Sequence, residues 1–155
     1  MAGQDRSSPG GAGGGAPDAG GDDLAEAAGA QSSGAAGRGG AVEDCLFCKI
    51  IGGEVPATVV RETSRTLAFR DINPQAPTHV LVIPREHYAD AAALADADAG
   101  LLDEVVRTAH EVAVADGVAE SGYRLVFNSG RDAQQTVFHV HAHVLGGRGF
   151  GWPPG

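Results

Sequence analysis

Three histidines at alternate positions near the end of the chain constrain its fold more than any other feature. Residues 136–145 carry His139, His141 and His143, with small or branched apolar residues between them. Successive side chains of a β-strand point to opposite faces, so the three imidazoles would line one face, about 7 Å apart. In a helix the same rings would be spread around the axis. The spacing therefore predicts a strand over 136–145, ended by Gly146-Gly147.

A row of three imidazoles suits several kinds of chemistry. Histidine changes its charge near neutral pH, so the row fits proton transfer, nucleophilic attack or metal binding. Structural histidines without chemistry are the alternative. A metal site built on the row alone would need a further ligand such as a carboxylate, and none stands nearby in the sequence. The row therefore marks a candidate active site.

Length and composition exclude several classes of protein. The 155 residues suffice for one domain with a sizeable core. A formal net charge of −9, with no Lys/Arg cluster, argues against tracking a nucleic-acid backbone. No apolar run approaches the roughly 20 residues of a membrane span, and no secretory signal begins the chain. We expect a cytoplasmic protein that binds neither nucleic acid nor membranes.

The chain divides into two parts by composition. Residues 1–41 are rich in Gly, Ala, Ser and Asp and contain hardly any large hydrophobic residue. Such a segment cannot bury enough apolar surface to offset the entropy lost on ordering. We therefore expect a disordered tail over 1–41 and a folded domain over 42–155.

Hydrophobic periodicity in the folded part predicts strands around one main helix. A short helix is expected over 44–53, with Asp44 as its N-cap and Gly52 as its C-terminal stop. A long helix is expected over 96–116, where apolar residues recur at helical spacing. The expected strands are 58–62, 66–70, 79–83, 123–128 and 136–145. The fold class is α+β with an antiparallel sheet.

Three stretches of sequence point to one family. Residues 139–145 read His-Val-His-Ala-His-Val-Leu and resemble the motif of the histidine triad (HIT) superfamily. Residues 71–84 and the ending Trp-Pro-Pro-Gly at 152–155 are similar to its Hint branch in particular. The resemblance implies five strands, one long helix and one short helix per subunit. It also implies a homodimer in which two sheets join into one of ten strands.

The resemblance implies a purine nucleoside phosphoramidase, a nucleotide hydrolase acting through a covalent nucleotidyl-histidine. By the family pattern His141 attacks phosphorus, and the main-chain carbonyl of His139 accepts the N–H of its ring. His143 would lie near the leaving group. Thr136 stands where the Hint branch has serine, and its hydroxyl would hydrogen-bond the leaving nitrogen. His79 would support the triad by hydrogen bonding.

The same resemblance supplies expected nucleotide-binding residues. Asp71 matches the acidic residue that accepts hydrogen bonds from both ribose hydroxyls, although an Asp in a Pro-rich loop is often only a turn former. Asn128 matches a phosphate-side asparagine. The expected apolar walls around the purine are Leu46, Phe47, Phe69, Ile72 and Leu81. Gln135 and Trp152 complete the set, Trp152 as part of a tail that approaches the partner's active site.

One position departs from the Hint pattern. That pattern has glycine before Gln-Ser, whereas here Gln134 precedes Gln135-Thr136. If the backbone requires a positive φ there, Gln134 is unfavourable. We expect such a departure to affect catalytic efficiency rather than the class of reaction.

The two cysteines form a Cys-x-x-Cys pair that resembles many bacterial histidine triad proteins. Cys45 and Cys48 share one face of the expected short helix. They can be zinc ligands, a redox pair or two small core residues. Structural zinc takes four ligands, and the resemblance suggests His87 and His139 as the other two.

Two other functions compete with the phosphoramidase. One is hydrolysis of dinucleoside polyphosphates, although Fhit-type enzymes lack the Trp-Pro-Pro-Gly ending. The other is a nucleotide-binding scaffold dimer with little turnover.

Overall fold

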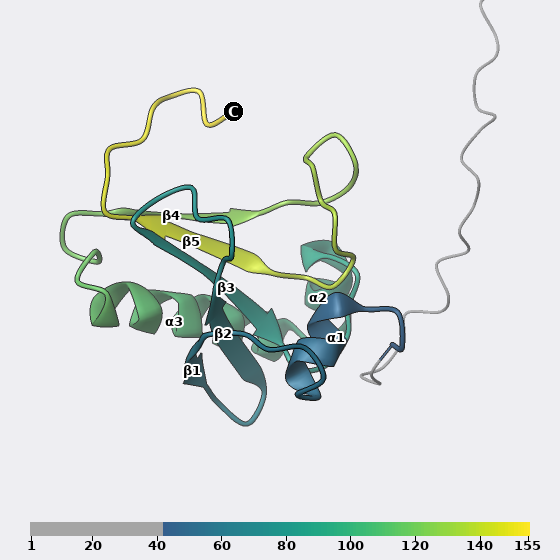
Figure 1. Ribbon diagram of the computed structural model, residues 1–155. Helices are drawn as coiled ribbons and strands as arrows, with labels where there is room; N and C mark the ends of the chain where they lie inside the picture. Colours follow the sequence, from purple (N-terminus) through teal and green to yellow (C-terminus); the bar gives the residue numbers. More distant parts are fainter. Residues whose placement is uncertain (1–41) are drawn as a thin grey trace, which may run out of the picture. The chain divides into compact units, whose positions relative to one another are not determined.

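The computed structural model describes residues 42–155, so the expected tail over 1–41 lies outside the described residues. Five strands form one antiparallel sheet in the order β1-β2-β3-β5-β4 (Figure 1). They are β1 (Val59–Glu62), β2 (Thr66–Arg70), β3 (Thr78–Pro84), β4 (Tyr123–Phe127) and β5 (Ala142–Gly146). The expected α+β class with an antiparallel sheet is confirmed.

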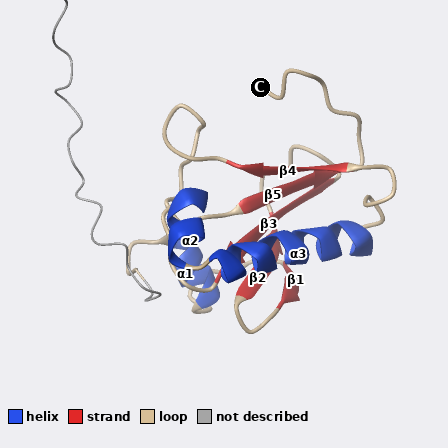
Figure 2. Cartoon of the chain, turned by 180° about the vertical axis from the view of Figure 1, so that it is seen from behind, coloured by secondary structure: helices blue, strands red, loops and turns tan. Residues whose placement is uncertain are grey.

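Helices α1 (Leu46–Ile51) and α3 (Ala99–Ala115) correspond to the two expected ones, and Figure 2 shows α3 lying along the sheet. The structure adds a short helix, α2 (Ala91–Ala97), which buries only Leu94 and therefore has no periodic apolar stripe to reveal it. Asp98 ends α2 and caps the N-terminus of α3. Within residues 42–155, no helix combines the length and apolar character needed to cross a bilayer.

The prediction that Asp44 is the N-cap of the first helix is wrong. The cap is Cys45, whose Sγ accepts a hydrogen bond from the backbone N–H of Cys48 at 3.4 Å. A sulfur atom replaces the usual oxygen acceptor at this position. The helix therefore begins directly after the first cysteine, and the thiol of Cys45 caps it while Cys48 lies within its first turn.

The sheet buries a different set of side chains on each face. One set packs with α2 and α3 and includes Ala68, Val80, Val82, Val140, Ala142 and Val144. The alternate residues pack with α1 and include Leu67, Phe69, Leu81 and Ile83. In the β3–β5 register Leu81 lies opposite His143, so His143 is on the α1 face. The alternation of histidines and core residues expected for this segment is thus confirmed.

The strand predicted over 136–145 is shorter than expected. Only His143 lies within β5, whereas His139 and His141 lie in the segment just before it. The register pairs Ala142 with Val82, so a longer β5 would have to pair with Pro84, which has no N–H to donate. The N–H of Val140 instead donates to the carbonyl of Tyr88 at 2.7 Å. The three imidazoles therefore do not form one evenly spaced row.

Candidate functional site

His141 has an orientation that exposes a lone pair on its ring. Nδ1 lies 2.8 Å from the main-chain carbonyl oxygen of His139. Because a carbonyl only accepts, Nδ1 must carry the ring proton, and Nε2 carries the lone pair. Phe47 of α1 packs edge to face against the ring, with centroids 5.0 Å apart. The sequence-based expectation for this carbonyl contact agrees with the geometry.

His143 receives its tautomer through a chain of hydrogen bonds. The backbone N–H of Gln75 donates to Nδ1 of His79 at 3.0 Å, so the proton of His79 is on Nε2. That Nε2–H donates to Nδ1 of His143 at 2.9 Å. His143 must then carry its own proton on Nε2, which is buried and has no partner within residues 42–155. His143 thus presents an unpaired N–H beside His141, their ring centroids 5.0 Å apart.

Burial keeps these rings uncharged near neutral pH. It lowers the pKa of His143 to about 4, and the neighbouring His141 and His79 add to the shift. Burial also lowers the pKa of His141 and of His79. Asp71 opposes the shift at His79, since its Oδ2 lies 3.4 Å from Nε2 of that ring. A neutral imidazole retains the lone pair that nucleophilic attack requires.

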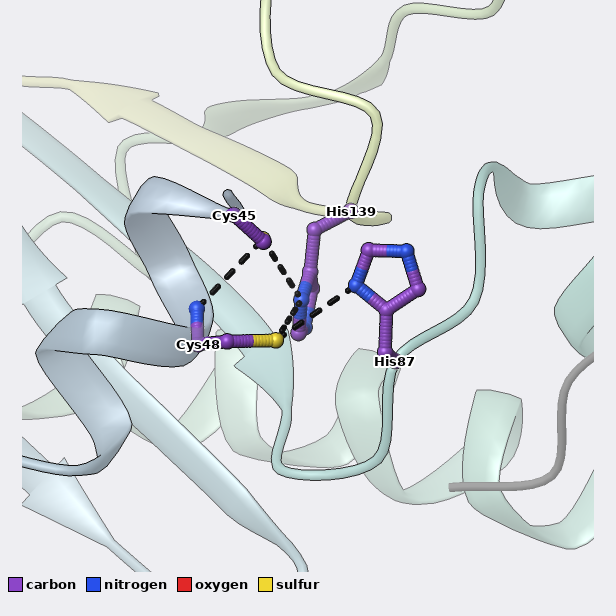
Figure 3. A group of neighbouring side chains, drawn as sticks. All are labelled: Cys45, Cys48, His87 and His139. Carbon is purple, nitrogen blue, oxygen red and sulfur yellow. Dashed lines mark hydrogen bonds between the residues drawn. The ribbon is translucent and has the colours of Figure 1, made fainter. Parts of the chain in front are cut away.

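A second cluster joins α1 to the active segment. Cys45, Cys48, His87 and His139 each offer a donor atom, and all four atoms lie within 4.8 Å of one another (Figure 3). Nδ1 of His139 is 3.5 Å from Sγ of Cys45 and 3.6 Å from Sγ of Cys48. Nδ1 of His87 is 3.5 Å from Sγ of Cys48. These four side chains can hold a metal ion.

His139 therefore belongs to the cysteine cluster by its side chain, as the resemblance suggested, while its main-chain carbonyl contacts His141. Its Nε2–H donates to the carbonyl of Pro84 at 2.8 Å, which leaves Nδ1 unprotonated toward the thiols. Burial lowers the pKa of His139 to about 4, with smaller contributions from His87 and His141. Such a neutral ring, held by a backbone carbonyl, is a competent metal ligand.

Asp71, His79 and His143 form another group of donor atoms within 4.8 Å of one another. Here the hydrogen bonds from Gln75 to His79 and from His79 to His143 already assign each proton. We therefore interpret this group as a hydrogen-bonded relay. The carboxylate that the sequence did not show near the triad is supplied in space by Asp71.

The remaining expected site residues differ in accessibility. Ile72, Trp152 and Leu46 are 100%, 85% and 45% exposed, so their side chains are open to a ligand. Phe47, Phe69 and Leu81 are buried in the α1-face cluster. Thr136 is exposed and Asn128 is half-buried. That these residues contact the nucleotide stays a prediction.

Gln135 uses its amide inside the protein. Oε1 accepts from the N–H of Gly130 at 2.9 Å. Nε2 donates to the carbonyls of Ala89 at 2.8 Å and Val137 at 3.2 Å. This buried side chain therefore ties the loop before the active segment to the residues that follow His87.

Gln134 has φ of 60°, the only non-glycine residue with positive φ within residues 42–155. The expected conflict at this position is confirmed, because an L-residue with a Cβ is strained in the left-handed region. Replacing Gln134 with Gly is expected to raise the free energy of unfolding by about 0.5 to 1 kcal/mol, measured by urea denaturation. Gln134→Ala retains a Cβ and serves as the control with little gain. Equal stabilisation by both variants would contradict strain at this position.

Sequence reasoning missed the backbone groups that set the tautomers. The N–H of Gln75 and the carbonyl of Pro84 fix His79 and His139, respectively. Every residue type offers a carbonyl, and nearly all offer an N–H. No residue-type pattern could therefore have revealed these two contacts.

Comparison with known proteins places the chain in a family. The model of the HIT domain matches residues 52–150, and the chain belongs to the HIT domain family. It is 54% identical to a HIT family hydrolase from Legionella pneumophila Philadelphia 1, whose crystal structure gives a TM-score of 0.70. That similarity covers 72% of this chain and 100% of the Legionella chain.

Within the family the chain is Hint-like. Over 112 residues it is 46% identical to the 14 kDa zinc-binding protein of Zea mays, covering 71% of this chain and 87% of that relative. Over 112 residues it is 44% identical to adenylylsulfatase HINT1 of Arabidopsis thaliana, covering 71% and 76%. These similarities confirm the resemblance seen in the histidine motif and the C-terminal residues.

Proposed function

We propose that this protein is a nucleotide hydrolase that cleaves the P–N bond of purine nucleoside 5′-monophosphoramidates. The observation that carries the proposal is the hydrogen bond from Nδ1 of His141 to the carbonyl of His139, which leaves a lone pair on Nε2. Membership of the HIT family and similarity to a HIT family hydrolase support hydrolysis. One relative is named an adenylylsulfatase and another a HIT family hydrolase, and cleavage of the P–N bond is our assignment for this chain.

The reaction proceeds in two displacements at phosphorus. Nε2 of His141 attacks, the P–N bond breaks, and the leaving nitrogen takes up a proton to depart as an amine. The unpaired Nε2–H of the neutral His143 is the hydrogen-bond donor that the site offers to this nitrogen, and the proton that the nitrogen takes up comes from solvent. Water then attacks the nucleotidyl-histidine, releases the nucleoside monophosphate and gives up a proton to solvent.

The expected nucleotide contacts are part of the proposal. Asp71 binds the ribose hydroxyls, and the exposed Ile72 and Leu46 contact the purine with the neighbouring aromatic residues. Thr136 and Asn128 lie on the phosphate side. Trp152 is free to contact the leaving group of a substrate.

We further propose that Cys45, Cys48, His87 and His139 hold a structural zinc ion. Zinc–sulfur bonds of about 2.3 Å and zinc–nitrogen bonds of about 2.0–2.1 Å at tetrahedral angles separate sulfur and nitrogen ligands by about 3.5–3.6 Å. Three of the four sulfur–nitrogen distances in the cluster are 3.5, 3.5 and 3.6 Å, and the fourth is within 4.8 Å. The zinc would join α1 to the active segment and take no part in the chemistry at phosphorus. Similarity to a zinc-binding protein of Zea mays supports this assignment.

A cytoplasmic homodimer completes the proposal. β4 ends the sheet of the described residues with one edge unpaired. A second copy of the chain could pair along this edge and give one sheet of ten strands.

The substrate class is tested by comparing three adenosine compounds with the native protein. We expect kcat/KM for a fluorogenic tryptamine phosphoramidate of adenosine to exceed that for diadenosine triphosphate and for adenosine 5′-phosphosulfate by about tenfold or more. The phosphosulfate is included because a relative is named an adenylylsulfatase. A higher value for either competitor would overturn the P–N assignment. Binding of AMP without turnover of any of the three would favour the scaffold.

A further inference from the structure

We propose that Arg148 is a positioning residue that links the C-terminal arm, residues 147–155, to the tautomer of His143. The inference rests on the proposed hydrolase function and adds a residue to it. Arg148 belongs to neither cluster of donor side chains, and its hydrogen bonds within residues 42–155 go to two backbone carbonyls. Its effect on the site passes through the backbone of Gln75.

The guanidinium of Arg148 bridges the arm and the loop between β2 and β3. Nε–H donates to the carbonyl of Gln75 at 3.0 Å, and the terminal NH1 donates to the carbonyl of Gly149 at 2.9 Å. The same group lies 4.2 Å from the centre of the Phe150 ring, close enough for a cation–π interaction. Arg148 is therefore held by its own arm while it holds Gln75.

The arm is anchored independently to the sheet. The guanidinium of Arg124, in β4, lies 5.0 Å from the centre of the Phe150 ring. Its NH2 group donates to the carbonyl of Gly151 at 2.9 Å. Figure 1 shows the arm leaving the sheet after β5 as the last, yellow segment. This second anchor offers a way to loosen the arm without touching Gln75.

The loop that Arg148 holds is exposed at its tip. Apart from the bond from Gln75 to His79, its other side-chain hydrogen bonds there are local, from the N–H of Asn73 to Asp71 and from the Gln75 amide to the carbonyl of Asn73. Asn73, Pro74 and Gln75 are exposed. Gly147 packs so closely on Pro77 that an added Cβ would lie 2.9 Å from the Cβ of that proline. The arm therefore contacts the loop at two successive residues, Gly147 and Arg148.

The position of Gln75 decides which proton His143 can offer. Its N–H donates to Nδ1 of His79, and this bond places the proton of His79 on Nε2. Without the hydrogen bond from Gln75, the ring proton of His79 can move to Nδ1, and Nε2 of His79 then accepts a hydrogen bond from His143. The proton of His143 would then move to Nδ1, and Nε2 would lose the N–H proposed for the leaving nitrogen. The hydrogen bond from Gln75 to His79 thus decides whether Nε2 of His143 is a hydrogen-bond donor or an acceptor.

The test replaces Arg148 with Gln in the full-length protein. We expect kcat for the adenosine phosphoramidate to fall about tenfold while KM changes less than about twofold, because the variant disturbs a hydrogen bond to the leaving nitrogen and not a contact that binds the substrate. Imidazole ¹⁵N spectra are expected to show a mixture of tautomers for His79 and His143, in place of single Nε2–H forms. Arg107→Gln, which removes an exposed ion pair with Asp103 on α3, is the matched control and should change neither readout.

The Arg124→Gln variant separates the link to Gln75 from general anchoring of the arm. It removes a contact to Phe150 and Gly151 but leaves the Gln75 bond, so we expect native tautomers and a kcat within about twofold of native. Native tautomers in Arg148→Gln, or an equal loss of kcat in Arg124→Gln, would overturn the inference. The ¹⁵N readout needs no turnover, so it tests the link even if the native protein does not cleave phosphoramidates.

Discussion

Replacement of His141 by alanine is expected to abolish turnover of the adenosine phosphoramidate, with a loss in kcat/KM on the order of 10⁴-fold or more. Nε2 of this ring is the nucleophile of the proposal, and its tautomer is fixed by the carbonyl of His139. Alanine removes the attacking atom and leaves the backbone unchanged. Steady-state fluorescence of the released tryptamine measures the rate, and AMP binding to the variant shows that the site is intact.

His110→Ala is the matched control for this experiment. His110 lies on α3, is exposed, and hydrogen-bonds the hydroxyl of Tyr123 at 3.0 Å. We assign it no chemistry, so kcat/KM should stay within about twofold of native. Substantial turnover in His141→Ala would mean that another group attacks phosphorus. AMP binding by a native protein that turns nothing over would favour the scaffold.

Conversion of Cys45 and Cys48 to serine is expected to eliminate bound zinc and to lower thermal stability. Zinc at a free concentration of about 1,000 times its dissociation constant would stabilise the folded state by about 4 kcal/mol. Loss of that zinc is expected to lower Tm by about 10 °C or more. Elemental analysis should give one zinc per native chain and none in the double variant. Thermal unfolding by circular dichroism measures the change in Tm.

A chelator provides the internal control for the zinc prediction. It should lower the Tm of the native protein toward that of the double variant and leave the variant itself unchanged. Native protein that takes up no zinc from a zinc-containing buffer would identify the cysteines as core residues. A disulfide between Cys45 and Cys48 in freshly purified protein would instead favour the redox interpretation.

The fold class could be predicted from the sequence because the alternation of apolar residues and histidines along a strand is a local pattern. Val140, Ala142 and Val144 face the helices, and this period-two pattern is visible in seven consecutive residues. The length of the strand could not be predicted, because β5 begins only at Ala142, opposite Val82, and a longer strand would have to pair with Pro84. Helix α2 was missed for a related reason, since a short helix that buries one leucine has no periodicity to detect.

The candidate site was accessible in its residue types but not in its connections. Cys45 and His139 are separated by 94 residues, so only the resemblance suggested that they meet. The tautomers of His79 and His139 depend on the N–H of Gln75 and the carbonyl of Pro84, which carry no signal in residue type. Long-range contacts of this kind become visible only when the sheet register is known.

His139 takes part in two sites through different parts of the same residue. Its imidazole faces the thiols, and its main-chain carbonyl orients the nucleophile. Mutation can therefore remove the role of the His139 imidazole without the role of its carbonyl, but not the reverse. A substitution at position 139 can delete the proposed metal ligand while the carbonyl persists, but no substitution there can delete the carbonyl and spare the ligand. A related protein could thus lose the proposed zinc ion and still keep the carbonyl that orients His141.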